Sequence, residues 1–204
     1  MNGKPLEETF GVDGMTTPNI QGLINYYAGK GKTYVECGSY QGRTLASAAY
    51  NNPNTKVIGI DNFSWGDKHG QNEKYVKAVV NVAASECKEA EFIKADTFDG
   101  LNILKERGCK IDVFFYDAEH THEATYKALV LANRMATKDA VFIIDDTNWE
   151  YVLSAVDAFC EAYKYKIIFQ KFTEKNGSSD WWNGITVIKK ITTKRKTKKD
   201  EGTA

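Results

Sequence analysis

Short apolar runs alternate along this chain with segments whose apolar residues recur at helical spacing. The runs that are typical of strands cover residues 34–37, 56–60, 91–93, 111–116, 140–144, 165–172 and 185–190. The segments that favour helices cover residues 17–29, 44–50, 72–88, 98–107, 123–135 and 149–163. Because strands and helices alternate and several strands are apolar throughout, the pattern predicts a mostly parallel sheet with helices on both faces.

The last two predicted strands are joined by about a dozen residues without a helical pattern. That connection is too short for the helical crossover between parallel neighbours, so we expect these strands to be antiparallel. Their connection carries Trp181 and Trp182. Two adjacent tryptophans are costly to expose, and the sequence leaves two alternatives: a wall of a substrate site or interface, or a loop that folds its rings back onto the domain.

Acidic residues stand at or next to the carboxyl ends of four predicted strands, at Glu36, Asp61, Asp117 and Asp145. Ligands of open α/β sheets bind at this edge. An acid there can also cap the next helix, so each one alone has a structural explanation. Four of them along one edge favour a ligand site.

The first of these strands leads into the stretch VECGSYQGRT, residues 35–44, in which Gly38 and Gly42 lie four residues apart. A strand that turns through glycine into a helix leaves backbone N–H groups free for a nucleotide-like cofactor, although an ordinary strand–turn–helix joint uses glycine too. We interpret Gly38 as the point where the backbone approaches the ligand, since any side chain there would collide with it. The Gly-x-Gly-x-x-Gly pattern is absent, which disfavours nicotinamide.

Composition sets wider limits. A chain of 204 residues with 42% hydrophobic content predicts one domain, which we place at residues 1–191 with an irregular lead-in over 1–14. Basic and acidic residues balance, so the chain as a whole has no preference for nucleic acid or an anionic membrane. The basic tail over 192–204 is expected to be disordered, with nucleic-acid binding as the alternative.

No apolar run approaches the roughly 20 residues that span a bilayer, so no membrane partner is expected. The four cysteines lie far apart without a Cys-x-x-Cys pair, and the N-terminus has no basic-plus-apolar leader. These features favour a reducing, cytoplasmic setting.

An acid and two glycines after the first strand, an acid after the second and an antiparallel last strand resemble the class I S-adenosylmethionine-dependent methyltransferases over residues 15–190. The stretches VECGSYQGRT, FFYDAEH and FIIDDTNW are similar to the signatures of metal-dependent small-molecule O-methyltransferases of the catechol and caffeoyl-coenzyme A type. They also resemble the sugar and macrolide O-methyltransferases with an Asp-Gly-Asp-His motif. The resemblance implies a Rossmann-like, doubly wound α/β fold of seven strands in the order 3-2-1-4-5-7-6, with strand 7 antiparallel.

The resemblance also implies the residues that contact S-adenosylmethionine. They are Glu36, Gly38, Tyr40, Gly42 and Thr44 around the methionine end, Asp61 at the ribose, Asp96 and Thr97 at the adenine, and Asp117. A carboxylate with two acceptor oxygens suits a pair of ribose hydroxyls. Phe63 and Trp65 are candidates to cover the adenine face, unless they belong to the core.

Asp117, Asp145 and Asp146 match the metal-binding positions of these families, the third being asparagine in the catechol-type enzymes. Crowded carboxylates repel one another unless a cation neutralises them, and oxygen ligands suit Mg²⁺, or else Ca²⁺ or Mn²⁺. The alternative is that Asp145 and Asp146 serve only as turn and helix-cap residues.

His120 follows Asp117 by three residues, where the catechol-type family carries its general-base lysine. A neutral histidine accepts a proton near neutral pH, which predicts Asp117 and His120 as catalytic residues. His122 is the nearby competitor for the role of base. Residues expected to line the substrate are Trp149, Trp181 and Trp182.

The sequence thus predicts an enzyme, an O-methyltransferase that uses S-adenosylmethionine and Mg²⁺ or another divalent cation to methylate a small sugar or phenol-like diol. One alternative is another enzyme on the same scaffold, either a metal-independent methyltransferase or a hydroxylation-pathway protein, because fold does not fix reaction. The other is a nonenzymatic binding protein. The expected partner is a small-molecule hydroxyl acceptor, and the sequence leaves the oligomeric state open, a homo-oligomer included.

Overall fold

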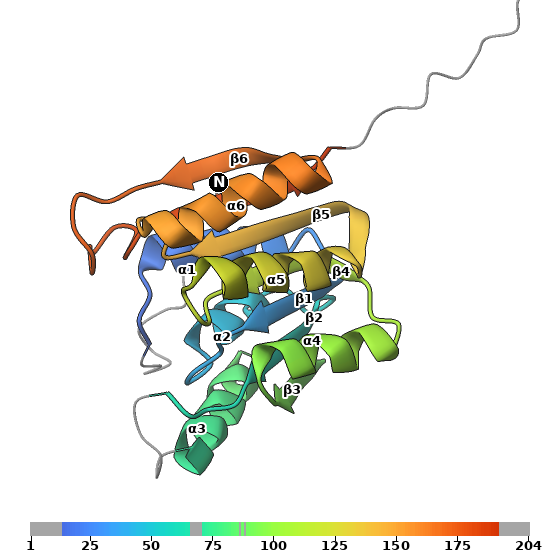
Figure 1. Cartoon of the computed structure of the whole chain (residues 1–204). Coiled ribbons are helices and arrows are strands. Elements are labelled where there is room, and N and C mark those ends of the chain that lie inside the picture. The colour runs from blue at the N-terminus through green and yellow to red at the C-terminus, as the bar shows by residue number, and fades with distance from the viewer. Residues whose placement is uncertain (1–13, 66–70, 86, 88, 192–204) are drawn as a thin grey trace, which may run out of the picture.

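A single seven-stranded sheet organises the computed structural model, which describes residues 14–65, 71–85, 87 and 89–191 (Figure 1). The strands are β1 (Thr33–Cys37), β2 (Lys56–Asp61), β3 (Ala90–Lys94), β4 (Ile111–Tyr116), β5 (Ala136–Asp145), β6 (Tyr165–Lys171) and β7 (Ile185–Lys190). The helices are α1 (Pro18–Ala28), α2 (Arg43–Ala49), α3 (Gln71–Ala84), α4 (Thr97–Glu106), α5 (His122–Asn133) and α6 (Glu150–Tyr163).

The strand order is β3-β2-β1-β4-β5-β7-β6, which confirms the predicted topology. Strands β1 to β5 pair in parallel, and β7 runs antiparallel to both of its neighbours. The connection between β6 and β7 is therefore the short one that the sequence predicts. The lead-in predicted over 1–14 lies outside the described residues except for Gly14, and the tail predicted over 192–204 lies wholly outside them.

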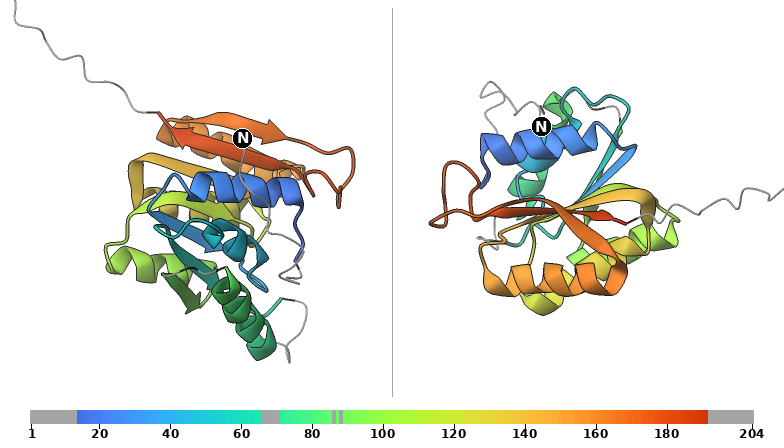
Figure 2. Two further views of the ribbon diagram at one scale, coloured as in Figure 1. Left: turned by 180° about the vertical axis from the view of Figure 1, so that it is seen from behind. Right: turned by 90° about the horizontal axis from the view of Figure 1, so that it is seen from above.

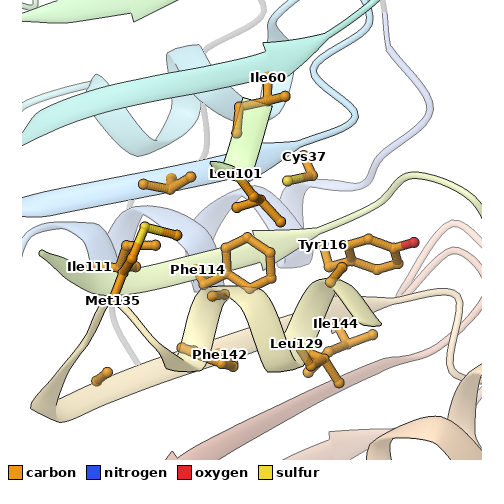
Figure 3. Close-up of a cluster of buried hydrophobic side chains, with 14 of the residues drawn as sticks. Cys37, Ile60, Leu101, Ile111, Phe114, Tyr116, Leu129, Met135, Phe142 and Ile144 are labelled. Atoms are coloured by element: carbon orange, nitrogen blue, oxygen red, sulfur yellow. The ribbon is translucent and has the colours of Figure 1, made fainter. Parts of the chain in front are cut away.

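Helices cover both faces of the sheet (Figure 2). Buried side chains of α1, α2 and α3 pack on one face, and those of α4, α5 and α6 pack on the other. On the face covered by α4, α5 and α6, Leu101 of α4 and Leu129 of α5 belong to the same buried cluster as Phe114 and Phe142 of the central strands (Figure 3). Both faces of the central strands are buried, which explains their continuous apolar sequence.

Local capping sets several of the element boundaries. The Thr17 hydroxyl accepts a hydrogen bond from the Ile20 amide at 3.4 Å, and Pro18 occupies the first turn of α1, as predicted. Several boundaries differ from the prediction: α3 ends at Ala84 rather than at residue 88, α5 ends at Asn133, and β5 already begins at Ala136. Ala136 pairs with Ile111, and the register with β4 then shifts before Val141, so tertiary pairing extends the strand beyond its apolar run.

None of the helices in the described part of the chain is long and apolar enough to cross a membrane.

Candidate active site

The parallel strands bring the predicted acids to one edge of the sheet. Cys37 of β1 pairs with Ile60 and Tyr116, and Tyr116 pairs with Ile144. The residues that come next along these strands form a row at the carboxyl edge: Asp61, Gly38, Asp117 and Asp145. Glu36 precedes this row by two residues on β1. The sheet therefore places the expected cofactor and metal positions side by side.

The glycines of the first turn serve the packing of the protein itself. Gly38 has a φ of 91°, and a Cβ there would lie 1.7 Å from the carbonyl oxygen of Asp117. Gly42 has a φ of 80°, and its Cβ would lie 2.9 Å from the Cα of Ala78 in α3. The backbone after β4 is thus one obstacle to a side chain at Gly38, and the expected collision with the ligand stays a prediction.

Glu36 is fully buried beneath this turn. Its carboxylate accepts a hydrogen bond from the Tyr34 hydroxyl at 2.7 Å, while its Oε1 atom and the Ser39 hydroxyl make no well-oriented hydrogen bond to a described residue. Burial raises the pKa of Glu36 to about 8, although the nearby hydroxyls of Tyr34, Thr44 and Ser39 oppose that rise. A buried carboxyl group with an unfilled acceptor fits a cation, such as the ammonium group at the methionine end of S-adenosylmethionine.

Asp61, the residue expected at the ribose, is held by two backbone amides. Its Oδ2 accepts a hydrogen bond from the Tyr40 amide at 2.7 Å, and its Oδ1 accepts one from the Phe63 amide at 2.5 Å. Each carboxylate oxygen has a second lone pair, so the pair remains able to accept bonds from two hydroxyls. The turn after β1 and the end of β2 thus hold this carboxylate in a fixed orientation.

The two aromatic candidates for the adenine face differ clearly in exposure. Phe63 is 1% exposed and packs edge-on against Tyr75, so it belongs to the core. Trp65 is 62% exposed and meets the Tyr40 ring at a centroid distance of 5.6 Å. Only Trp65 is therefore free to contact a ligand near Asp61.

Asp96 and Thr97 lie where β3 passes into α4. Asp96 caps this helix by accepting a hydrogen bond from the Phe98 amide at 3.0 Å, and Thr97 is the first helical residue. Thr44 is buried in the first turn of α2. The contacts of Asp96 and Thr97 with adenine, and of Thr44 with the methionine end, stay predictions.

A compact group of charged side chains lies at the ends of β4 and β5. One ligand atom each from Asp117, His120 and Asp146 falls within 4.8 Å of the others. The His120 Nε2 atom lies 3.4 Å from Asp117 Oδ1 and 2.5 Å from Asp146 Oδ2. Nε2 is buried and makes no well-oriented hydrogen bond to any described residue. Two carboxylates and an imidazole that converge in this way fit a divalent cation.

Asp145, the third predicted metal ligand, is not part of this group. It is 2% exposed, and its Oδ1 accepts a hydrogen bond from the Asp146 amide at 3.0 Å. Burial, together with the charges of Asp117 and Asp146, raises the pKa of Asp145 well above its ordinary range. Asp145 is therefore a buried residue of the strand end that lies outside this group, and its role as a metal ligand stays a prediction.

The protonation of His120 depends on its carboxylate neighbours. Burial lowers the pKa of His120, but the contacts with Asp117 and Asp146 outweigh burial and raise the pKa to about 10. Without a cation, the imidazole is therefore charged at neutral pH. A cation that took over the two carboxylates would remove the cause of the raised pKa and would favour the neutral ring.

His122, the competing base, points elsewhere. Its Nδ1 atom lies 2.9 Å from the Ser154 hydroxyl, and its ring stacks on Tyr126. It is exposed at the start of α5. The geometry therefore favours His120.

The three tryptophans that were expected at the substrate also separate. Trp149 packs partly on the core cluster of α4, α5 and α6, meets the His120 ring edge-on at 4.7 Å and borders an open hollow of about 520 Å³. Trp181 packs on Phe169, and both Trp181 and Trp182 lie against the core cluster of α1 and α2. The contacts thus favour a loop that packs Trp181 and Trp182 onto the domain. Of the three tryptophans, Trp149 is the one beside His120.

Sequence reasoning missed one residue of this site. Asn183 precedes β7, and its Nδ2 donates a hydrogen bond to Asp146 Oδ1 at 2.6 Å. The two residues are 37 positions apart, and the only local signal is a polar residue before a glycine. No pattern in the sequence could have identified the partner of Asn183.

With this geometry in place, the sequence matches a family described as a methyltransferase domain over residues 35–147. The chain belongs to that methyltransferase family. No curated protein matches the sequence. The family and the fold together identify a class I S-adenosylmethionine-dependent methyltransferase, so the alternative of a nonenzymatic binding protein is set aside.

Solved structures share the fold of this methyltransferase at low sequence identity. One is a protein from Streptococcus mutans described as a candidate SAM-dependent methyltransferase, with a TM-score of 0.67, 11% identity and coverage of 84% of this chain but only 48% of that one. The second is the O-methyltransferase TomG from Streptomyces achromogenes in complex with SAM, with a TM-score of 0.62, 16% identity and coverage of 86% and 80%. The third is CalS11, a TDP-rhamnose 3'-O-methyltransferase of calicheamicin biosynthesis, with a TM-score of 0.60, 16% identity and coverage of 83% and 76%.

Proposed function

We propose that this methyltransferase transfers the methyl group of S-adenosylmethionine to a hydroxyl oxygen of a small molecule, assisted by a divalent cation that Asp117 and Asp146 hold. The observation that carries the proposal is the convergence of these carboxylates with His120 beside the cofactor edge. The names of TomG and CalS11, both O-methyltransferases, support oxygen as the target atom.

The side chains at this edge suit both a divalent cation and S-adenosylmethionine. For the cation, one oxygen each of Asp117 and Asp146 lies within 4.8 Å of the other at the ends of β4 and β5. For the cofactor, Glu36 offers an unfilled buried acceptor for the ammonium group, and Asp61 offers its two fixed oxygens for the ribose. When bound, the cofactor supplies a sulfonium methyl group, and a divalent cation lowers the pKa of a hydroxyl that it binds.

His120 is the residue that we assign to proton removal. With a cation bound, Asp117 and Asp146 would no longer hold the imidazole charged, so the ring would lose its proton to solvent and the neutral ring would be free to accept the hydroxyl proton. Trp149 holds His120 from the side with an edge-on ring contact at 4.7 Å, which restricts the imidazole orientation. Asp145 stays buried behind this group and touches no reacting atom in the proposal.

The acceptor is proposed to enter through the hollow beside Trp149. This hollow has about 520 Å³ of space and is bordered by Phe172, Thr173 and neighbouring polar residues. Aromatic and polar side chains together suit a ring with several hydroxyl groups. We therefore infer an acceptor with neighbouring hydroxyls, either a sugar or a phenol-like diol.

The test is a methyl-transfer assay on a panel of sugars and catechols, run with added Mg²⁺, with EDTA, and with EDTA followed by excess Mg²⁺. Activity should be lost in EDTA and return with Mg²⁺. Full activity in EDTA would show that the cation has no role, and it would favour the metal-independent methyltransferase. Absence of methylated product across the panel, with S-adenosylmethionine bound, would point to another reaction on this scaffold.

The role of His120 is tested by His120→Ala beside the matched variant His122→Ala. His120→Ala should lose turnover by about a hundredfold or more while it binds S-adenosylhomocysteine normally, since general-base catalysis contributes about 10²–10⁴-fold. His122→Ala should keep near-normal turnover, because that ring contacts Ser154 and Tyr126. The reverse result would make His122 the base.

A further inference from the structure

A loop residue 37 positions further along the chain contacts one carboxylate of the charged group. Asn183 lies in the connection from β6 to β7 and is 8% exposed. Its Nδ2 donates to Asp146 Oδ1 at 2.6 Å, while the other carboxylate oxygen, Oδ2, faces His120. Because one oxygen is occupied, the second is the one that Asp146 presents to the site.

The orientation of the Asn183 amide is itself fixed. Its Oδ1 accepts a hydrogen bond from the Gly177 amide at 2.8 Å. A backbone N–H only donates, so the amide oxygen must face Gly177 and the NH₂ group must face Asp146. The Asn183 carbonyl also accepts a bond from the Asn148 amide at 2.8 Å, which ties the same residue to the end of β5.

The backbone at Asp146 adopts an uncommon conformation. Asp146 has a φ of 58°, in the left-handed region that residues other than glycine seldom adopt. Asp145 and Asp146 follow one another where β5 ends, and this backbone turn directs the Asp146 carboxylate toward His120. Strained backbone persists only where its surroundings hold it, and Asn183 provides a direct side-chain contact.

We propose that Asn183 is a positioning residue that holds the Asp146 carboxylate toward Asp117 and His120, and so prepares the cation site. This inference rests on the proposed function. Residues that orient metal ligands typically change metal affinity by about ten- to a hundredfold when they are replaced. Asn183 touches neither substrate nor cofactor in this role, since it acts through Asp146.

The test compares Asn183→Leu with Asn148→Leu in the whole protein. Asn148 is the matched control because its side chain anchors the same loop, through bonds with Thr173, but touches none of the carboxylates. Mn²⁺ binding is measured by electron paramagnetic resonance on folded protein. Asn183→Leu should raise the Mn²⁺ dissociation constant at least tenfold, and Asn148→Leu should leave it within about twofold of the unsubstituted protein.

Equal Mn²⁺ affinity in Asn183→Leu and the unsubstituted protein would overturn the positioning role. So would an equal loss in both variants, since that would show a general effect of loop anchoring. If the unsubstituted protein binds no Mn²⁺, the cation in the proposed function fails, and the crystal structure of Asn183→Leu decides the inference alone. An Asp146 carboxylate turned away from His120 supports it, and an unchanged carboxylate refutes it.

Discussion

Replacing Glu36 by glutamine should stabilise the free protein at alkaline pH and weaken its hold on the cofactor. Glu36 is fully buried, and burial raises the pKa of its carboxyl group to about 8 from an ordinary value of 4.5. Between these two values the folded chain retains a proton that the unfolded chain has released. The free energy of unfolding therefore falls as pH rises through this window.

The magnitude follows from the shift. Each pKa unit corresponds to about 1.4 kcal/mol, so the contribution of Glu36 should fall by about 3 kcal/mol between about pH 5.5 and about pH 8.5. Glutamine keeps the shape and the acceptor for the Tyr34 hydroxyl but carries no charge. The free energy of unfolding of Glu36→Gln, relative to that of the unsubstituted protein, should thus be about 3 kcal/mol larger at the higher pH than at the lower one.

The assay is urea unfolding of both proteins without cofactor at the two pH values. His120 has a raised pKa as well, and its stabilising contribution is lost as pH rises from its unfolded value of 6.5 toward about 10. That contribution is present in both proteins, so the difference between them isolates Glu36. The same stability difference at both pH values would refute the reasoning, because it would mean that Glu36 is not held protonated by burial.

Further predictions concern the cofactor edge. Calorimetry should show that the affinity of the unsubstituted protein for S-adenosylhomocysteine rises by up to about tenfold per pH unit toward about pH 8. Glu36→Gln should bind S-adenosylhomocysteine more weakly, and its affinity should not change with pH below about pH 8. Asp61→Ala should weaken the same binding at least roughly tenfold, since a charged acceptor for the ribose is lost; unchanged affinity would place the ribose elsewhere. Gly38→Ala should lower the melting temperature far more than Gly108→Ala, whose added Cβ meets nothing within 4 Å and whose φ of 70° alone costs about 1 kcal/mol. Equal losses in the two glycine variants would show that the 1.7 Å approach to Asp117 relaxes easily.

The candidate site could be predicted in outline from the order of the strands. Glu36, Asp61 and Asp117 lie at or next to strand ends in the sequence, and parallel pairing must bring those ends to one edge. The membership of the charged group could not be predicted in the same way. Asp145 and Asp146 are adjacent, and only the left-handed backbone at Asp146 decides which of them faces His120.

The aromatic residues show the same division. Trp149, Trp181 and Trp182 all follow strands or occupy polar loops, so the sequence offers no means to rank them. All three pack partly against core clusters, and of the three only Trp149 makes a ring contact with His120. Phe63 is likewise a core residue, because its ring packs on Tyr75 of α3, 12 positions later in the chain.

By itself, the sequence determined the strands, the helices and their succession along the chain, because apolar periodicity, caps and glycine turns act between residues that are close along the chain. The family followed from the resemblance of three short motifs. Only the tertiary structure decided what Gly38 accommodates, which carboxylates meet His120, and that Asn183 supports Asp146. Each of these depends on contacts between segments that folding brings together from distant positions. A contact of that kind leaves no local pattern in the sequence, since the partner is specified by the geometry of the whole sheet.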